Sequence, residues 1–153
     1  MSFFSQRVAR IQPSPTISIT AKAKKLKQEG KKIIDFSAGE PDFDTPNNVK
    51  NAAIKAIKDG QTKYTPVNGT KELNEAIIKK FKRENNLIFE TDEITVGCGG
   101  KQVIYNALLA TIEKGDEIII PSPFWVSYPD ITLLVEGHPI VLDCSLENNF
   151  KIN

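Results

Sequence analysis

Apolar residues in the first half of the chain recur every three or four positions, which predicts amphipathic helices. Each stretch begins at a hydroxyl residue suited to an N-cap, and two of them place Pro directly after it. Thr45 is expected to cap the second helix, with Pro46 as its first residue, and Thr70 to cap the third. The predicted helices span residues 14–30, 45–60 and 70–86.

Short runs of β-branched residues predict strands at 94–96, 117–120 and 139–142, with an earlier one at 33–36. From residue 93 onward these runs alternate with helical patterns at 101–111 and 128–135. Alternation of this kind favours an α/β fold with a parallel sheet. The unbroken apolar run at 117–120 further predicts a sheet covered on both faces.

Three glycines, Gly97, Gly99 and Gly100, stand between the predicted strand at 94–96 and the helix that follows. Backbone N–H groups at a helix N-terminus favour an anion, and glycines let a phosphate come close to the backbone. A P-loop is excluded because Gln102 replaces its Ser or Thr, and a dinucleotide fingerprint lacks its third glycine there. On the glycines alone, a ligand-free tight turn stays open beside phosphate binding.

Composition adds little to this picture. The chain has 153 residues and a net charge of +1, which gives no indication of nucleic acid or an acidic membrane as partner. Cys98 and Cys144 form no CxxC pair, and His138 has no assigned role. No signal peptide or membrane-spanning run is expected. A cluster of lysines is interpreted as a solvated helix face: Lys22, Lys24, Lys25, Lys27, Lys31 and Lys32.

Four motifs together resemble the class I aminotransferases, pyridoxal-phosphate enzymes of the aspartate aminotransferase fold (fold type I). They are Ser37-Ala38-Gly39-Glu40-Pro41-Asp42-Phe43-Asp44-Thr45-Pro46, Lys63-Tyr64-Thr65, Gly99-Gly100-Lys101-Gln102 and Ser122-Pro123-Phe124-Trp125-Val126-Ser127-Tyr128-Pro129. The subgroup that they resemble most is the bacterial aspartate aminotransferases, some of which accept prephenate. The resemblance implies an α/β fold of which this chain is the N-terminal part, with an incomplete, mainly parallel sheet flanked by helices.

The resemblance implies roles for six residues of this chain. Gly99, Gly100 and Lys101 match the turn whose amides hold the phosphate of pyridoxal 5′-phosphate. Trp125 matches the aromatic residue that stacks on the pyridine ring and reaches toward the substrate, and Gly39 matches a loop that contacts the substrate. Lys101 also matches a residue that receives the distal carboxylate of a dicarboxylic substrate. Tyr64 matches a tyrosine that reaches the cofactor of the neighbouring subunit, which implies a homodimer.

The resemblance leaves no catalytic residue within this chain. The family's Schiff-base lysine follows a later strand, so it is expected beyond residue 153, and the 153-residue chain alone is expected to be inactive. Prephenate-accepting relatives carry a basic residue at the position of Gln12, which argues against prephenate as a substrate. The implied protein is a cytoplasmic enzyme of amino-acid metabolism that takes an amino acid and a 2-oxo acid, without metal, nucleic acid or membrane.

The expected organisation is an N-terminal arm and small-domain segment at 1–45, then the first part of the large cofactor-binding domain at 46–153. The few predicted strands indicate the front part of a larger protein. Alternatives are another fold type I lyase or synthase, a dinucleotide-binding domain, and a non-catalytic ligand-binding module or truncated product. A regulator with a DNA-binding domain is disfavoured because the resemblance begins near Arg7.

Overall fold

The computed structural model describes residues 3–152 and divides into two compact units. One unit comprises Met1–Ala38 together with Gly99–Asn153, and the other comprises Gly39–Cys98. Each unit is described by itself. The division between an arm with a small-domain segment and a large domain at residue 45 concerns the complete fold and stays a prediction.

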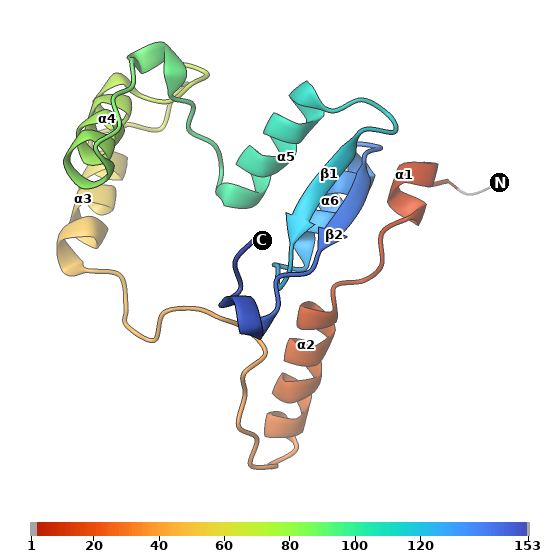
Figure 1. The fold of residues 1–153 in the computed structure, drawn as a ribbon. Helices are drawn as coiled ribbons and strands as arrows, with labels where there is room; N and C mark the ends of the chain where they lie inside the picture. Colours follow the sequence, from red (N-terminus) through yellow and green to blue (C-terminus); the bar gives the residue numbers. More distant parts are fainter. Residues whose placement is uncertain (1–2, 153) are drawn as a thin grey trace. The chain divides into compact units, whose positions relative to one another are not determined.

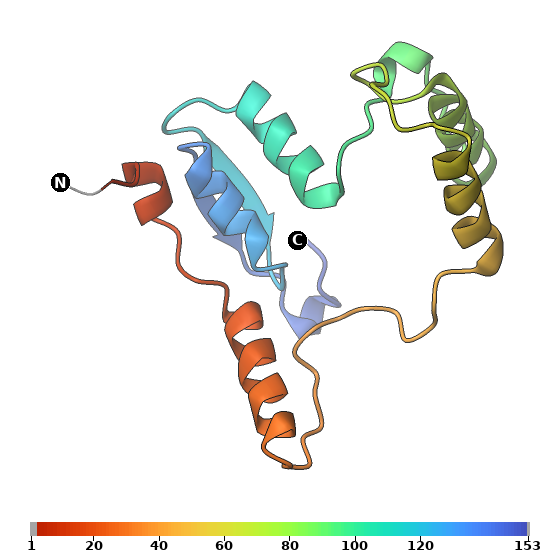
Figure 2. The same cartoon turned by 180° about the vertical axis from the view of Figure 1, so that it is seen from behind.

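The first unit contains a two-stranded parallel sheet joined by a helical crossover (Figure 1). Strand β1, Glu117–Pro121, pairs with β2, His138–Leu142, so that Ile119 lies opposite Ile140. Helix α6, Ser127–Leu134, connects them and covers one face of the pair, as Figure 2 shows from behind. Ile120, Ile131 and Val135 are buried there. The predicted strands at 117–120 and 139–142 are confirmed, each with an end shifted by one residue.

The other face of this sheet is open, which contradicts the prediction of a sheet covered on both faces. Ile119 is 65% exposed. It points away from the face on which its neighbour Ile120 is buried, because successive strand residues alternate between faces. The sequence run is apolar on both faces, but residues 3–152 supply a cover for only one of them.

Helix α2, Pro15–Gln28, lies in the same unit and begins as predicted. The Ser14 hydroxyl accepts a hydrogen bond from the Ile17 N–H at 3.5 Å, and Pro15 occupies the first turn. Gly30, with φ of +79°, follows the C-terminus of the helix. A four-residue helix, α1 at Gln6–Ala9, precedes α2 where an irregular arm was expected.

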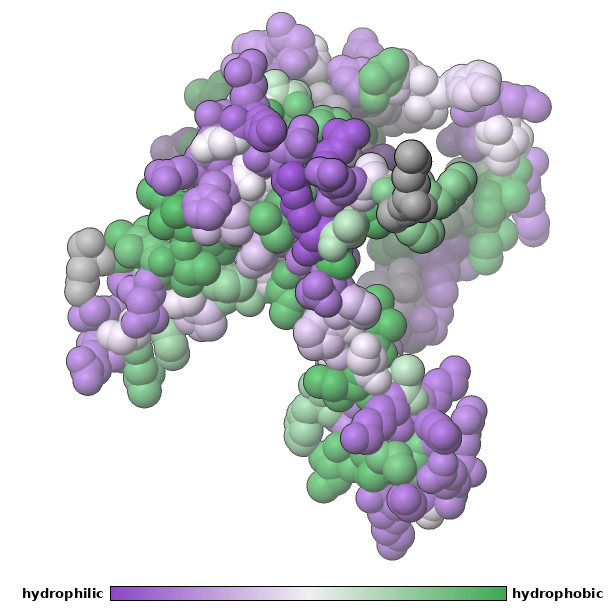
Figure 3. Space-filling view, turned by 90° about the vertical axis from the view of Figure 1, so that its right-hand side faces the viewer, coloured by the Kyte–Doolittle hydropathy of each residue, from purple (hydrophilic) through white to green (hydrophobic). Residues whose placement is uncertain are grey.

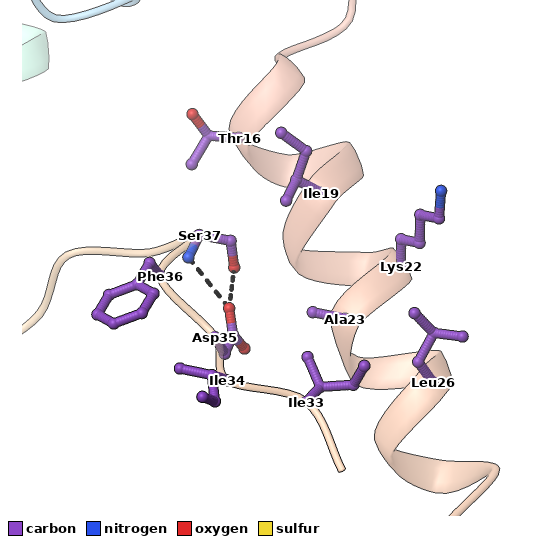
Figure 4. Close-up of a pocket in the computed structure, with 10 residues that line it drawn as sticks. All are labelled: Thr16, Ile19, Lys22, Ala23, Leu26, Ile33, Ile34, Asp35, Phe36 and Ser37. Atoms are coloured by element: carbon purple, nitrogen blue, oxygen red, sulfur yellow. Dashed lines mark hydrogen bonds between the residues drawn. The ribbon is translucent and has the colours of Figure 1, made fainter. Parts of the chain in front are cut away.

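The predicted strand at 33–36 is wrong, because this segment has no strand partner among the described residues and lies along α2 instead. It borders an apolar pocket of about 440 Å³, drawn in Figure 4. The Asp35 carboxylate accepts hydrogen bonds from the Ser37 hydroxyl at 2.6 Å and from Lys27 Nζ at 3.0 Å. These bonds, those of Ser37 foremost, lower the pKa of Asp35 to about 2.

The surface of this segment mixes apolar and charged residues. In Figure 3 the lowest part of the view, which is α2 with residues 29–37, shows green apolar side chains beside purple hydrophilic ones. Ile34 and Phe36 are almost fully exposed. None of the residues that the sequence singled out as a candidate site lines this pocket.

The second unit contains two helices, α3 at Asn47–Lys58 and α4 at Lys71–Asn85, and a short 3₁₀ helix, η1 at Thr91–Glu93. Thr70 caps α4 as predicted, with its hydroxyl accepting from the Leu73 N–H at 3.3 Å. The predicted cap of α3 is wrong: Pro46 is the N-cap, and no side chain caps the helix. The helix thus begins one residue later than predicted, and the Thr45 N–H donates to the Asp44 carboxylate at 2.7 Å.

The predicted strand at 94–96 is also wrong. Ile94 is buried with an extended backbone (φ −112°, ψ 126°), yet the segment pairs with no strand of the part of the chain that is described. Its contact is with a loop, where the Val96 N–H donates to the Asn68 carbonyl at 3.1 Å. The β-branched pattern predicts a buried strand, and Ile94 is indeed buried, but the hydrogen-bonded ladder that defines a strand needs a neighbouring strand.

The remaining described elements are helix α5, Gly100–Thr111, and a second 3₁₀ helix, η2, at Leu146–Asn148. The prediction of a helix over 101–111 is confirmed, and that over 128–135 is confirmed within one residue as α6. Among residues 3–152, no helix combines the length and the apolar character that a membrane crossing requires.

Candidate functional site

The N-terminus of α5 carries the glycine pair that the sequence singled out. Gly99 is the N-cap, with φ of 91° and ψ of 160°, a conformation open essentially only to glycine. No side chain caps the helix, and its first turn contains no acidic residue. The positive end of the helix dipole is therefore not neutralised by a side chain of this turn.

The space beside both glycines is empty. A Cβ built on Gly99 or on Gly100 meets no heavy atom within 4 Å, and Gly100 does not have a positive φ. Packing within this unit therefore gives no reason for glycine at position 100. A group that approaches the backbone from outside would give one, because a side chain there would fill the space that the group needs.

Lys101 and Trp125 lie together beside this turn. The Lys101 ammonium nitrogen is 4.7 Å from the centroid of the Trp125 ring, which is a cation–π contact. Trp125 is 44% exposed, so part of its ring surface is available to another molecule. The pair thus presents a positive charge and a flat aromatic surface in the same place.

The fold holds Trp125 through the connection between β1 and α6. Its carbonyl accepts a hydrogen bond from the Tyr128 N–H at 3.0 Å as the first turn of α6 forms. The Tyr128 ring meets the indole edge to face, with ring centroids 5.5 Å apart. Tyr128 belongs to a motif quoted from the sequence, but its support of Trp125 was not predicted. The spacing of three residues across a helix start is the signal that could have revealed it.

Lys101 and Trp125 also border a pocket of about 380 Å³. Gln12 lines it from the segment before α2, and Asp130 lines it from α6. The structure therefore brings Gln12 to the same pocket as two predicted site residues, Lys101 and Trp125. A residue that influences the choice of substrate needs to lie in such a place. Asp130 was not singled out from the sequence, where nothing distinguishes it from an ordinary helix-start carboxylate.

These features fit a phosphate monoester attached to an aromatic ring. The uncapped helix start with open glycines suits the phosphate, and Trp125 offers a face for the ring. The same arrangement offers no metal site. No group of three or more His, Cys, Asp or Glu side chains within the described part of the chain is placed to hold an ion.

Two predicted site residues lie in the second unit, Gly39 at its first position and Tyr64 in the loop before α4. The Tyr64 side chain is fully exposed. A Cβ built on Gly39 meets nothing within 4 Å. The structure thus brings four predicted site residues together in one unit, and the roles of Gly39 and Tyr64 stay predictions.

The sequence matches the family model described as "Aminotransferase class I and II" over residues 31–153. This chain belongs to that aminotransferase family. Its curated relatives include the aspartate/prephenate aminotransferase of Nitrosomonas europaea, 60% identical over 97% of this chain and 38% of that protein. A probable aspartate/prephenate aminotransferase of Rickettsia bellii is 57% identical over the whole chain and 38% of its own length.

Solved aminotransferases share the fold. The aspartate aminotransferase of Thermus thermophilus with maleate superposes with a TM-score of 0.95 at 42% identity, over 100% of this chain and 40% of that one. The aspartate aminotransferase of Rhizobium meliloti gives a TM-score of 0.92 at 47% identity, over 99% and 38%. The chain therefore spans about two fifths of the length of the aminotransferases that it matches. The α/β fold class and the resemblance inferred from the four motifs are confirmed.

Proposed function

We propose that the full-length protein containing this chain is a pyridoxal-phosphate-dependent aminotransferase that moves an amino group from aspartate to a 2-oxo acid. The observation that carries the proposal is the uncapped glycine start of α5 beside the Lys101–Trp125 pair. Family membership and relatives named aspartate/prephenate aminotransferase support the reaction class.

In this proposal the main-chain N–H groups of the α5 start hold the cofactor phosphate. Gly99 permits the turn, and Gly100 leaves room for the phosphate oxygens. The Lys101 ammonium adds a positive charge at the first turn, and the Trp125 ring beside it would offer its face to the pyridine ring. Pyridoxal phosphate supplies an electron sink for the negative charge that develops on the substrate carbon. The residues of this chain orient it there.

Tyr64 contributes to the site of a neighbouring subunit in a homodimer. Its fully exposed side chain, free of packing within its own unit, supports such a role. A phenolic hydroxyl donates one hydrogen bond to a phosphate oxygen. The lysine that binds the cofactor covalently lies outside residues 1–153, so this chain supplies part of the site.

The substrate preference follows from the pocket beside Trp125. Lys101, which lines this pocket, attracts the distal carboxylate of a dicarboxylic amino acid. The main chain of the Gly39 loop, as the resemblance implies, contacts the substrate. Gln12, in the same pocket, is neutral, so it offers a hydrogen bond without a second positive charge. Aspartate and glutamate, with their 2-oxo acids, are therefore the proposed substrates, with prephenate a poor one.

The test is a coupled assay on the purified full-length enzyme. Aspartate and 2-oxoglutarate are added with and without pyridoxal phosphate, and oxaloacetate is followed by its reduction with NADH and malate dehydrogenase. Oxaloacetate formation that requires pyridoxal phosphate is the expected result. A protein that binds the cofactor without transferring an amino group would instead be a lyase or synthase of the same fold. A protein that binds no pyridoxal phosphate would contradict the proposal altogether.

A further inference from the structure

We infer that Gly69 is a positioning residue for Tyr64: its lack of a side chain lets the Tyr64 loop lie against α4 and the 94–96 segment. This inference rests on the proposed function, because it concerns how the Tyr64 hydroxyl is held in place to meet a cofactor phosphate. All the contacts that carry it lie within the Gly39–Cys98 unit.

The backbone of Gly69 is in close contact with two side chains. A Cβ built on it would lie 3.0 Å from Asn74 Oδ1, 3.0 Å from Val96 Cγ2 and 3.1 Å from Val96 Cβ. Contacts of this length are tighter than nine in ten real Cβ contacts, so a methyl there would force a neighbour or the loop to move by a few tenths of an ångström. Gly69 also has φ of +107°, which a side chain would strain independently of the contact.

Neither neighbour can move aside easily. Asn74 lies in the first turns of α4 and is 3% exposed, so its amide cannot turn toward solvent. Its N–H donates to the Thr70 carbonyl at 3.0 Å, which ties it to the capped start of the helix. Val96 is held by its N–H bond to the Asn68 carbonyl. The loop is therefore the part that would yield.

The loop transmits such a shift to Tyr64 over a short and stiff path. The Gly69 N–H donates to the Pro66 carbonyl at 3.0 Å and closes a turn. Pro66 has a fixed φ and restricts Thr65 before it, so few backbone rotations separate the turn from Tyr64. The Tyr64 ring is fully exposed, so no packing within its own unit holds it, and the loop backbone sets the position from which the side chain reaches.

The same junction touches the segment that enters the glycine turn. The hydrogen bond between Asn68 and Val96 joins the Tyr64 loop to residues 94–96, three residues before Gly99. Asn74 Oδ1 accepts no hydrogen bond within the described residues, so it does not hold the loop by bonding. Close packing at Gly69, together with the one backbone bond at Asn68, sets the loop position.

The test compares two ligands on full-length apoenzyme. Dissociation constants are measured for pyridoxal phosphate and for pyridoxal, which lacks the phosphate. The dissociation constant for pyridoxal divided by that for pyridoxal phosphate is a ratio that reports the phosphate contacts alone. Gly69→Ala is expected to lower this ratio about tenfold, corresponding to ~1.4 kcal/mol. Tyr64→Phe is expected to lower it similarly, and the double variant no further, because Gly69 acts through Tyr64.

Gly60→Ala is the matched control. Gly60 also has a positive φ of +77°, yet a Cβ there meets nothing within 4 Å. It places a side chain at a positive φ without the contact, so the ratio should stay at the wild-type value. If Gly69→Ala does not fold, Val96→Ala is used in its place, because this substitution removes the methyl group nearest to Gly69. Val96→Ala should lower the ratio about threefold in the wild-type background and leave it unchanged in the Tyr64→Phe background.

Two results would overturn the inference while leaving the proposed function intact. One is an equal change of both dissociation constants in Gly69→Ala, because a merely structural role would weaken the two ligands alike. The same holds for Val96→Ala where that variant is used instead. The other is the same fall of the ratio in the Tyr64→Phe background as in wild type. A wild-type protein without affinity for pyridoxal phosphate would overturn the proposed function itself.

Discussion

Gly100 offers a substitution that should separate folding from ligand binding. The structure shows open space around a Cβ at this position and no positive φ. Gly100→Ala should therefore leave the free energy of unfolding unchanged or raise it by up to about 1 kcal/mol, the difference in helix propensity. The same methyl would stand where a phosphate approaches the first turn. Loss of one hydrogen bond to a charged group, about 1.5–3 kcal/mol, would weaken pyridoxal phosphate binding roughly 10- to 150-fold.

Gly100→Asp sharpens the contrast, because the two effects of a carboxylate have opposite signs. At a helix N-terminus the negative charge stabilises the fold by about 0.3–1 kcal/mol. Toward a phosphate within about 5 Å, at an effective dielectric constant of about 20, it is repulsive by roughly 3 kcal/mol per unit charge. Gly100→Asn has nearly the same shape without the charge, so the difference between the two variants isolates the electrostatic part.

The assay pairs urea denaturation of the apo protein with titration of pyridoxal phosphate, both on full-length variants. The expected outcome for Gly100→Asp is normal or increased stability with affinity reduced more than 100-fold. Wild-type affinity in Gly100→Asp would refute the reasoning, since no phosphate could then lie at this turn. A large loss of stability in Gly100→Ala would show that the glycine serves the fold.

Three further predictions concern other parts of the chain. Lys101→Met should raise the KM for aspartate about tenfold or more in steady-state assays, because it removes a charged contact worth ~1.5–3 kcal/mol. The KM for alanine, which has no distal carboxylate, should stay nearly unchanged. Asp35 has its pKa lowered to about 2 by bonds from Ser37 and Lys27, so it stabilises the fold above pH 4 and loses this effect as the pH falls toward 2. The difference in free energy of unfolding between wild type and Asp35→Asn should accordingly shrink over that range, and a constant difference would be inconsistent with this origin. Thr70→Ala should lower the free energy of unfolding by about 1 kcal/mol, because it removes the cap of α4. Thr70→Ser keeps the hydroxyl group and should retain most of this stability, and urea denaturation measures both variants.

The helices of this chain were predictable because their signals are local. Ser14 and Thr70 cap helices where their hydroxyl groups and spacing indicated, and Gly30 follows the end of α2. Thr45 was expected to cap α3, but the helix begins one residue later with Pro46 as its N-cap, a difference of register that spacing alone does not decide.

The strands were less predictable because each needs a partner. The segments at 33–36 and 94–96 have the residues of strands, but one lies along α2 and the other bonds to the Asn68 loop. A hydrogen-bonded ladder depends on residues distant in sequence, which no local pattern supplies. β1 and β2 were predictable because α6 brings them side by side within this chain.

The candidate site was predictable as a set of positions and not as a set of contacts. The motifs pointed to Gly99, Gly100, Lys101 and Trp125, which the structure places in one unit. The cation–π contact between Lys101 and Trp125, and the packing of Tyr128 on the indole, arise only from the folded chain. The tight contact at Gly69 likewise has no sequence signal beyond the glycine itself.

The most direct test is a crystal structure of the full-length protein with pyridoxal phosphate. The account predicts the phosphate at the start of α5, hydrogen-bonded to main-chain N–H groups there, with the Trp125 indole against the pyridine ring. A phosphate bound elsewhere, with side chains closed over Gly99 and Gly100, would contradict it.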